Sequence, residues 1–131
     1  MKPEATRARP ARITGAGHLF AALTYSLGGV RRLWQETALR HEVLAFVLAL
    51  GWSAFIGATL IEFAVLCAVF LMLVAVEAIN TAVECIVDHV SPEWAVFARD
   101  AKDLGSLAVM CMLLIAAIVL GIVTARHVLM A

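Results

Sequence analysis

Four polar side chains recur at helical spacing in an otherwise apolar part of the chain. They are Glu77, Asn80, Glu84 and Asp88, separated by three, four and four residues. Such spacing puts all four on one face of a helix. A row of hard carboxylate and amide oxygens is what a magnesium–nucleotide complex needs as ligands. The row therefore predicts phosphate chemistry.

The helix that carries this row is expected to span a membrane. It begins with the uncharged and almost wholly apolar residues 63–76, directly before Glu77. Carboxylates are expensive near hydrocarbon, so a stripe of them is interpreted as a functional site by default. Glu77 lies deepest, and a lipid hydroxyl sits just below the headgroup plane. A general base at that depth could reach the hydroxyl.

Composition supports a membrane protein of one domain. The chain has 131 residues, of which 63% are hydrophobic, and its net charge is zero. Its mean hydropathy of +0.96 is far above that of a typical soluble domain. Seven of the ten Lys and Arg residues precede residue 41, which predicts a cytoplasmic N-terminus for a multi-pass membrane protein. No nucleic-acid partner is expected.

The hydropathy pattern predicts an all-α fold. Residues 1–15 are expected to form a basic disordered tail, and 16–127 a membrane domain. That domain is predicted to hold an amphipathic surface helix at about 17–35 and three transmembrane helices at about 40–59, 62–90 and 98–125. Gly51, Ser53 and Gly57 offer small surfaces for close helix contact.

Further polar residues are expected to meet the row at the cytoplasmic membrane boundary. Glu36 follows the surface helix, and Lys102 and Asp103 lie near the start of the last span. Lys102 is suited to a phosphate oxygen as a point charge. The glycine pair Gly28-Gly29 lacks the Gly-Lys-Ser/Thr of a P-loop, so general motifs do not indicate nucleotide use.

Most of these residues also have a structural interpretation. Glu77 could be a carboxylate buried for helix packing and paired with a neighbouring cation. Asn80 could serve as an interhelical hydrogen-bond donor, and Glu84 with Asp88 could form a solvated helix end. Lys102 and Asp103 could simply begin the third span. Glu42 is most simply an interface residue near the first span.

Three blocks of the sequence resemble one family. Glu77-Ala-Ile-Asn-Thr-Ala-Val-Glu-Cys-Ile-Val-Asp88 is similar to the E-x-x-N-[ST]-A-[IV]-E-x-x-V-D signature of the small bacterial integral-membrane diacylglycerol kinases, which also include undecaprenol kinases. Ala101-Lys-Asp-Leu-Gly-Ser-Leu-Ala-Val109 resembles the family's A-K-D segment, and Trp34-Gln-Glu-Thr-Ala-Leu-Arg-His-Glu42 its E-x-A-F-R-x-E segment. The chain departs from the family pattern at Ala95 and Asp100, near the nucleotide end.

The resemblance implies a homotrimer in the bacterial inner membrane that transfers the γ-phosphate of ATP to the hydroxyl of diacylglycerol, with Mg²⁺, giving phosphatidic acid. Glu77 would be the general base on the lipid alcohol, and Glu36 and Glu84 would hold the metal ion. Asn80 would position Glu77 and the phosphates.

The remaining roles also come from the resemblance. Lys102 would contact the phosphates, and Asp88 and Asp103 would line the nucleotide end together with Glu36, Asn80 and Glu84. Glu42 and Ser106 are assigned to the lipid substrate beside Glu77.

Two alternatives stay open. An undecaprenol kinase would use the same residues with a longer lipid, although Gly105-Ser106 resembles the Gram-negative diacylglycerol branch more. A non-catalytic bundle that conducts ions through its acidic stripe would need polar residues across the whole bilayer. Residues 63–76 contain none, which counts against that class.

Overall fold

Four helices make up the part of the chain that the structure describes, residues 16–129 of a computed structural model. They are α1 (Ala16–Leu33), α2 (Thr37–Phe55), α3 (Leu60–Val90) and α4 (Val96–Val128), and no strand occurs in this range. The tail expected at 1–15 lies outside the described residues.

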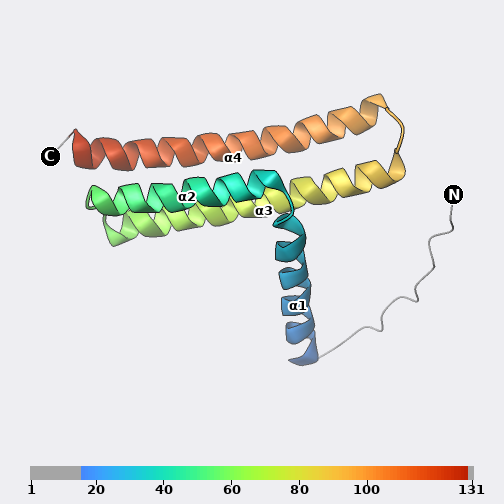
Figure 1. Cartoon of the computed structure of the whole chain (residues 1–131), viewed down its shortest axis with the longest axis horizontal. Coiled ribbons are helices and arrows are strands. Elements are labelled where there is room, and N and C mark those ends of the chain that lie inside the picture. The colour runs from blue at the N-terminus through green and yellow to red at the C-terminus, as the bar shows by residue number, and fades with distance from the viewer. Residues whose placement is uncertain (1–15, 130–131) are drawn as a thin grey trace. The chain divides into compact units, whose positions relative to one another are not determined.

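Three of the helices are long and apolar enough to cross a membrane: α2, α3 and α4. The chain is therefore an all-α integral membrane protein, as the hydropathy pattern predicts. α2 has 19 residues, whereas α3 has 31 and α4 has 33. The three lie side by side, and one end of the α3–α4 pair extends well beyond the start of α2 (Figure 1).

α1 is a separate unit of 18 residues. Its apolar side chains Phe20, Leu23, Leu27 and Val30 are exposed within the chain, and the basic pair Arg31–Arg32 lies in its last turn. That this helix lies on the membrane surface stays a prediction.

α2 ends earlier than the expected boundary near residue 59, because a glycine turn terminates it. Gly57 has a φ of 79°, in the left-handed region that favours glycine. The Ala58 N–H donates to the Ser53 carbonyl at 2.9 Å and the Gly57 N–H to the Ala54 carbonyl at 3.2 Å. These two bonds form a Schellman motif. Gly57 therefore serves as a helix terminator rather than as a helix-contact surface.

α3 and α4 pack along their length around a small apolar core. Leu73 of α3 is buried against Val109 and Met112 of α4, with Val69 and Val76 packed beside them. α2 is attached to α4 by a hydrogen bond in which Trp52 Nε1 donates to Thr124 Oγ1 at 2.9 Å. Many other apolar side chains are exposed, as expected for surfaces that face lipid or other subunits.

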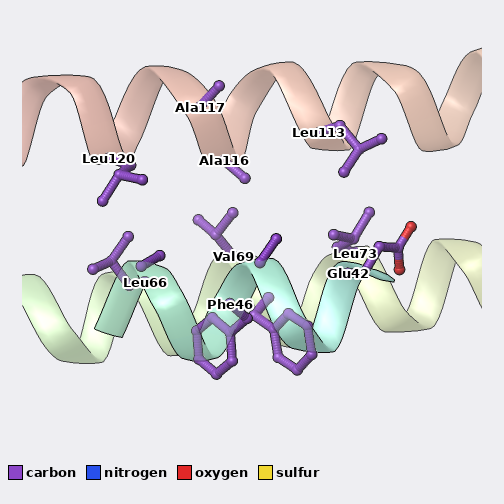
Figure 2. A pocket seen from close by; sticks show the side chains of 12 residues that line it. Glu42, Phe46, Leu66, Val69, Leu73, Leu113, Ala116, Ala117 and Leu120 are labelled. Carbon is purple, nitrogen blue, oxygen red and sulfur yellow. The ribbon is translucent and has the colours of Figure 1, made fainter. Parts of the chain in front are cut away.

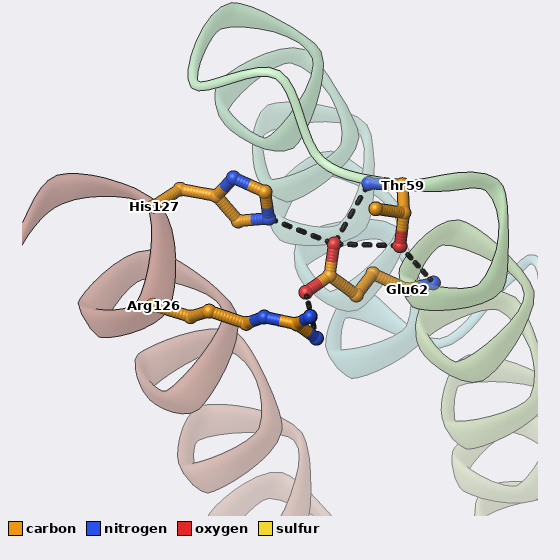
Figure 3. A network of polar contacts seen from close by, with 4 residues as sticks. All are labelled: Thr59, Glu62, Arg126 and His127. Atoms are coloured by element: carbon orange, nitrogen blue, oxygen red, sulfur yellow. Dashed lines mark hydrogen bonds and ion pairs between the residues drawn. The ribbon is translucent and has the colours of Figure 1, made fainter. Parts of the chain in front are cut away.

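A polar network joins the start of α3 to the end of α4 (Figure 3). Thr59 and Glu62 form a capping box: the Thr59 N–H donates to Glu62 Oε2 at 2.7 Å, and the Glu62 N–H to Thr59 Oγ1 at 3.4 Å. The same carboxylate meets His127 Nε2 at 2.9 Å and Arg126 Nη1 at 3.3 Å. Glu62 therefore caps its own helix and holds α4 in register.

Glu62→Gln is expected to lower the midpoint of thermal unfolding in detergent micelles by about 2–4 °C, because the amide keeps the shape but loses the charge that pairs with Arg126 and His127. Glu93→Gln makes the same change at an exposed loop position and serves as the control. Equal midpoints for the two variants would show that the network does not hold α3 to α4.

Candidate active site

The residues expected to carry chemistry gather mainly around one hollow between the start of α2, the middle of α3 and α4. Its lining includes Glu36, Glu77, Asn80, Glu84 and Ser106, and these five residues are called the acidic hollow below. The structure thus brings together residues that lie up to 70 positions apart in the chain.

α3 supplies three of the five through its helical repeat. Glu77 and Asn80 are buried, with 4% and 9% of their surface exposed, and Glu84 is half-buried. Thr81, one residue after Asn80, is also buried and lines the same hollow. The helix face predicted from the spacing therefore packs inward from Glu77 to Glu84. Asp88, one turn further along α3, is exposed.

Glu36 reaches the acidic hollow from the turn before α2. Its N–H donates to the Leu33 carbonyl at 3.0 Å, and its extended backbone makes it the N-cap of α2. The Glu36 side chain makes no capping hydrogen bond and lines the hollow instead. Aspartate and asparagine would cap a helix better, so the position is not optimised for capping.

Asn80 and Glu84 are directly connected. Asn80 Nδ2 donates to Glu84 Oε1 at 3.1 Å, one turn along α3. The interhelical hydrogen bond considered as the alternative for Asn80 is not found in the described part of the chain; its Oδ1 is buried without a hydrogen-bond partner there. The amide therefore fixes the orientation of the Glu84 carboxylate.

The acidic hollow concentrates negative charge. Glu77 lies within electrostatic range of both Glu84 and Glu36, and no cation of residues 16–129 is paired with it. A divalent cation would relieve this repulsion. No group of three His, Cys, Asp or Glu side chains among the described residues is arranged to hold a metal ion alone. Two carboxylates fit Mg²⁺ nonetheless, because Mg²⁺ is commonly held by one or two carboxylates plus substrate phosphates and water.

Three further predicted residues line a neighbouring hollow at the α3–α4 loop. Asp88, Lys102 and Asp103 lie there, and the Lys102 ammonium forms an ion pair with Asp88 across the two helices. Arg99 pairs with Asp100 at 2.8 Å and stands 4.0 Å from Asp103. Because α4 begins at Val96, Lys102 and Asp103 lie in its second turn rather than at its start.

Glu42 lies apart from the acidic hollow. It is buried at the end of an apolar hollow of about 240 Å³ between α2, α3 and α4, next to Leu73 and facing Leu113 (Figure 2). Further along this hollow the rings of Phe46 and Phe70 stack with centroids 4.0 Å apart. The Glu42 Oε2 atom has no hydrogen-bond partner among the described residues. A buried carboxylate in such surroundings is not the simple interface residue that the sequence suggests.

Sequence reasoning missed several participants. Thr81 follows Asn80 in the signature and could have been found by extending the helical face by one residue. The pattern Thr59-x-x-Glu62 is a readable capping box, but its partners Arg126 and His127 follow 64 and 65 residues later. Gly105 contacts Asn80 only through the packing of two helices, and no sequence signal indicates this.

Comparison with known proteins places the chain in a family. A model of the family "Prokaryotic diacylglycerol kinase" matches residues 24–124. A diacylglycerol kinase of Sinorhizobium sp. is 50% identical over 100 residues, which are 76% of this chain and 73% of the relative. Diacylglycerol kinases of Haemophilus influenzae and Escherichia coli are 36% and 31% identical, over 84% and 87% of this chain and 94% of each relative.

The chain belongs to the prokaryotic diacylglycerol kinase family, and the resemblance seen in its three sequence blocks is confirmed. It is an enzyme, a lipid kinase.

Proposed function

We propose that the protein transfers the γ-phosphate of ATP to the hydroxyl of diacylglycerol, giving phosphatidic acid, at the cytoplasmic face of the inner membrane. The observation that carries this proposal is the acidic hollow, in which a buried carboxylate, Glu77, lies beside two further carboxylates and the Asn80 amide. Phosphoryl transfer needs mainly positioning and charge neutralisation, which such a set supplies without a covalent intermediate.

The length of α3 supports a site at the membrane surface. Glu77 stands 17 residues after Leu60, or about 26 Å along the helix at 1.5 Å per residue. The hydrocarbon layer is about 30 Å thick. With Leu60 at one boundary, Glu77 comes just below the opposite boundary, where a diacylglycerol hydroxyl lies. Glu84, about two turns further, comes among the headgroups, where ATP can enter from water.

In the proposed reaction Glu77 accepts the proton of the lipid hydroxyl as that oxygen attacks the γ-phosphorus. A new oxygen–phosphorus bond forms, the bond from the γ-phosphorus to its bridging oxygen breaks, and ADP leaves with that oxygen. Burial of Glu77 supports this role, because a site closed to water keeps the γ-phosphate from being transferred to water instead of to the lipid. Ser106, on the opposite wall, is suited to orient the lipid hydroxyl by hydrogen bonding.

Glu36 and Glu84 would hold Mg²⁺, which when bound neutralises charge on the phosphate oxygens. Asn80 holds the Glu84 carboxylate in place through its hydrogen bond. Lys102 is suited to a phosphate oxygen, with Asp88 and Asp103 beside it at the nucleotide end. The existing ion pair between Lys102 and Asp88 would then be exchanged for a pair with phosphate.

Glu42 is assigned to the lipid substrate. Its apolar hollow begins near the acidic hollow, since Glu42 lies within electrostatic range of Glu77. An acyl chain matches the apolar lining, and Glu42 in its protonated form would donate a hydrogen bond to an ester carbonyl of the lipid, which would give its buried oxygen a partner.

A homotrimer with a cytoplasmic N-terminus completes the proposal. Exposed apolar residues such as Leu71, Ile79 and Ile86 run along α3 within the single chain, a surface that neighbouring subunits or lipid must cover. The excess of Lys and Arg before residue 41 supports the orientation.

The test is phosphate transfer from labelled ATP by the purified protein in mixed micelles with Mg²⁺, with diacylglycerol and undecaprenol offered separately. We expect labelled phosphatidic acid, and faster labelling of diacylglycerol than of undecaprenol. A preference for undecaprenol would keep the mechanism and reject the substrate. Labelling of neither lipid, by protein shown to be folded, would overturn the proposal.

A further inference from the structure

Gly105 of α4 lies directly against the side chain of Asn80 in α3. A Cβ atom built on Gly105 would lie 3.1 Å from Asn80 Cγ and would clash with Asn80 Oδ1. Gly51 in α2 and Gly121 in α4 have no heavy atom within 4 Å of the same position. Gly105 therefore differs from these two glycines, because the Asn80 side chain fills the space in which a Cβ atom at position 105 would lie.

The Asn80 amide has only one orientation that suits both of its neighbours. Its NH₂ group donates to the Glu84 carboxylate, which can only accept. Its oxygen is therefore turned toward α4, where it is buried and has no N–H or O–H donor among residues 16–129. At Gly105 a hydrogen stands where other residues carry a Cβ. A Cα–H pointing at a carbonyl oxygen is a weak, recurrent contact between packed helices.

We propose that Gly105 is a positioning residue for phosphoryl transfer, because it leaves the space in which the Asn80 amide orients Glu84. The inference rests on the proposed function, in which Glu84 holds the metal ion. A methyl group at position 105 would turn the Asn80 side chain away or push α4 outward. Either change breaks the hydrogen bond from Asn80 Nδ2 to Glu84 Oε1.

The test compares Gly105→Ala with Gly121→Ala, two identical changes in the same helix. Alanine favours helix over glycine, so neither change weakens α4 itself. We expect Gly105→Ala to lower kcat and to raise the Mg²⁺ concentration for half-maximal rate. The product of the two fold-changes should be about tenfold to a hundredfold. Gly121→Ala should keep wild-type values. A role in helix packing alone would lower the unfolding temperature without moving the Mg²⁺ requirement.

A double-mutant cycle with Asn80→Ala shows whether Gly105 acts through Asn80. Asn80→Ala removes the oxygen that the new methyl group would meet, so adding Gly105→Ala should cause no further loss of activity and should leave the folded fraction unchanged. Losses that multiply in the double variant would overturn the inference, as would equal failure of the single and double variants to fold.

The outcomes separate this inference from the proposed function. An active wild type whose Gly105→Ala variant keeps its rate and its Mg²⁺ requirement rejects the role of Gly105 alone. A folded wild type that labels no lipid rejects the proposed function and the role of Gly105 with it.

Discussion

Glu77→Gln is expected to lower kcat by about 10²–10⁴-fold while ATP and lipid still bind, because the amide keeps the size of the side chain but cannot accept the hydroxyl proton. Glu77 has 4% of its surface exposed, so water cannot readily replace it as the base. Its loss should not unfold the protein, since removing one charge relieves repulsion with Glu36 and Glu84. The measurements are kcat in mixed micelles, equilibrium ATP binding and the thermal midpoint.

Glu62→Gln is the matched control, since it makes the same change in the same helix, 15 residues earlier. The two variants should behave in opposite ways: Glu62→Gln is expected to lose stability and keep kcat, and Glu77→Gln to lose kcat and keep stability. Turnover by Glu77→Gln at a rate near that of the wild type would remove Glu77 from the base role.

Glu84→Gln is expected to raise the Mg²⁺ concentration for half-maximal rate by about tenfold or more, because one of the two proposed charged ligands becomes a neutral one. The half-buried Glu84 carboxylate is held by Asn80, so its replacement removes an oriented ligand rather than a mobile one. The measurement is the initial rate at saturating ATP and lipid over a range of Mg²⁺ concentrations. High Mg²⁺ should restore part of the rate.

Asp100→Asn provides the comparison for Glu84→Gln. Asp100 is an exposed acid of α4 that pairs with Arg99 and does not line the acidic hollow. Its variant should keep the wild-type Mg²⁺ response. If Glu84→Gln and Asp100→Asn respond alike, the metal ion is held elsewhere.

The three spanning helices were predictable because an uncharged apolar run of about twenty residues indicates a transmembrane helix. The residues at which the helices begin and end were harder to predict. α4 begins at Val96 and continues to Val128, beyond the apolar run at both ends, because polar residues continue a helix outside the hydrocarbon. α2 stops at Phe55 inside an apolar run, because the Gly57 turn outweighs hydropathy there.

The candidate site was predictable only along α3. Spacing alone brought Glu77, Asn80 and Glu84 to one face. The arrival of Glu36 depends on how α2 packs against α3, and the burial of Glu42 depends on all three spanning helices. Long-range contacts of this kind carry no local signal, so periodicity indicated neither residue. Glu36 was expected near the row only from its place after the surface helix, and Glu42 was assigned to the site through the family resemblance.

The Schellman turn at Gly57 sets the height of a residue that lies far from it. α2 and α3 are joined by only four residues, 56–59, whose backbone is fixed by hydrogen bonds at both sides. The number of residues between Gly57 and Glu36 therefore decides where along α3 the Glu36 carboxylate lies. With the present length of α2, it lines the same hollow as Glu77. One inserted residue in α2 would raise Glu36 by about 1.5 Å and rotate it by about 100° around the helix axis. The length of α2 is in this sense part of the proposed metal site, although most residues of α2 do not line the acidic hollow.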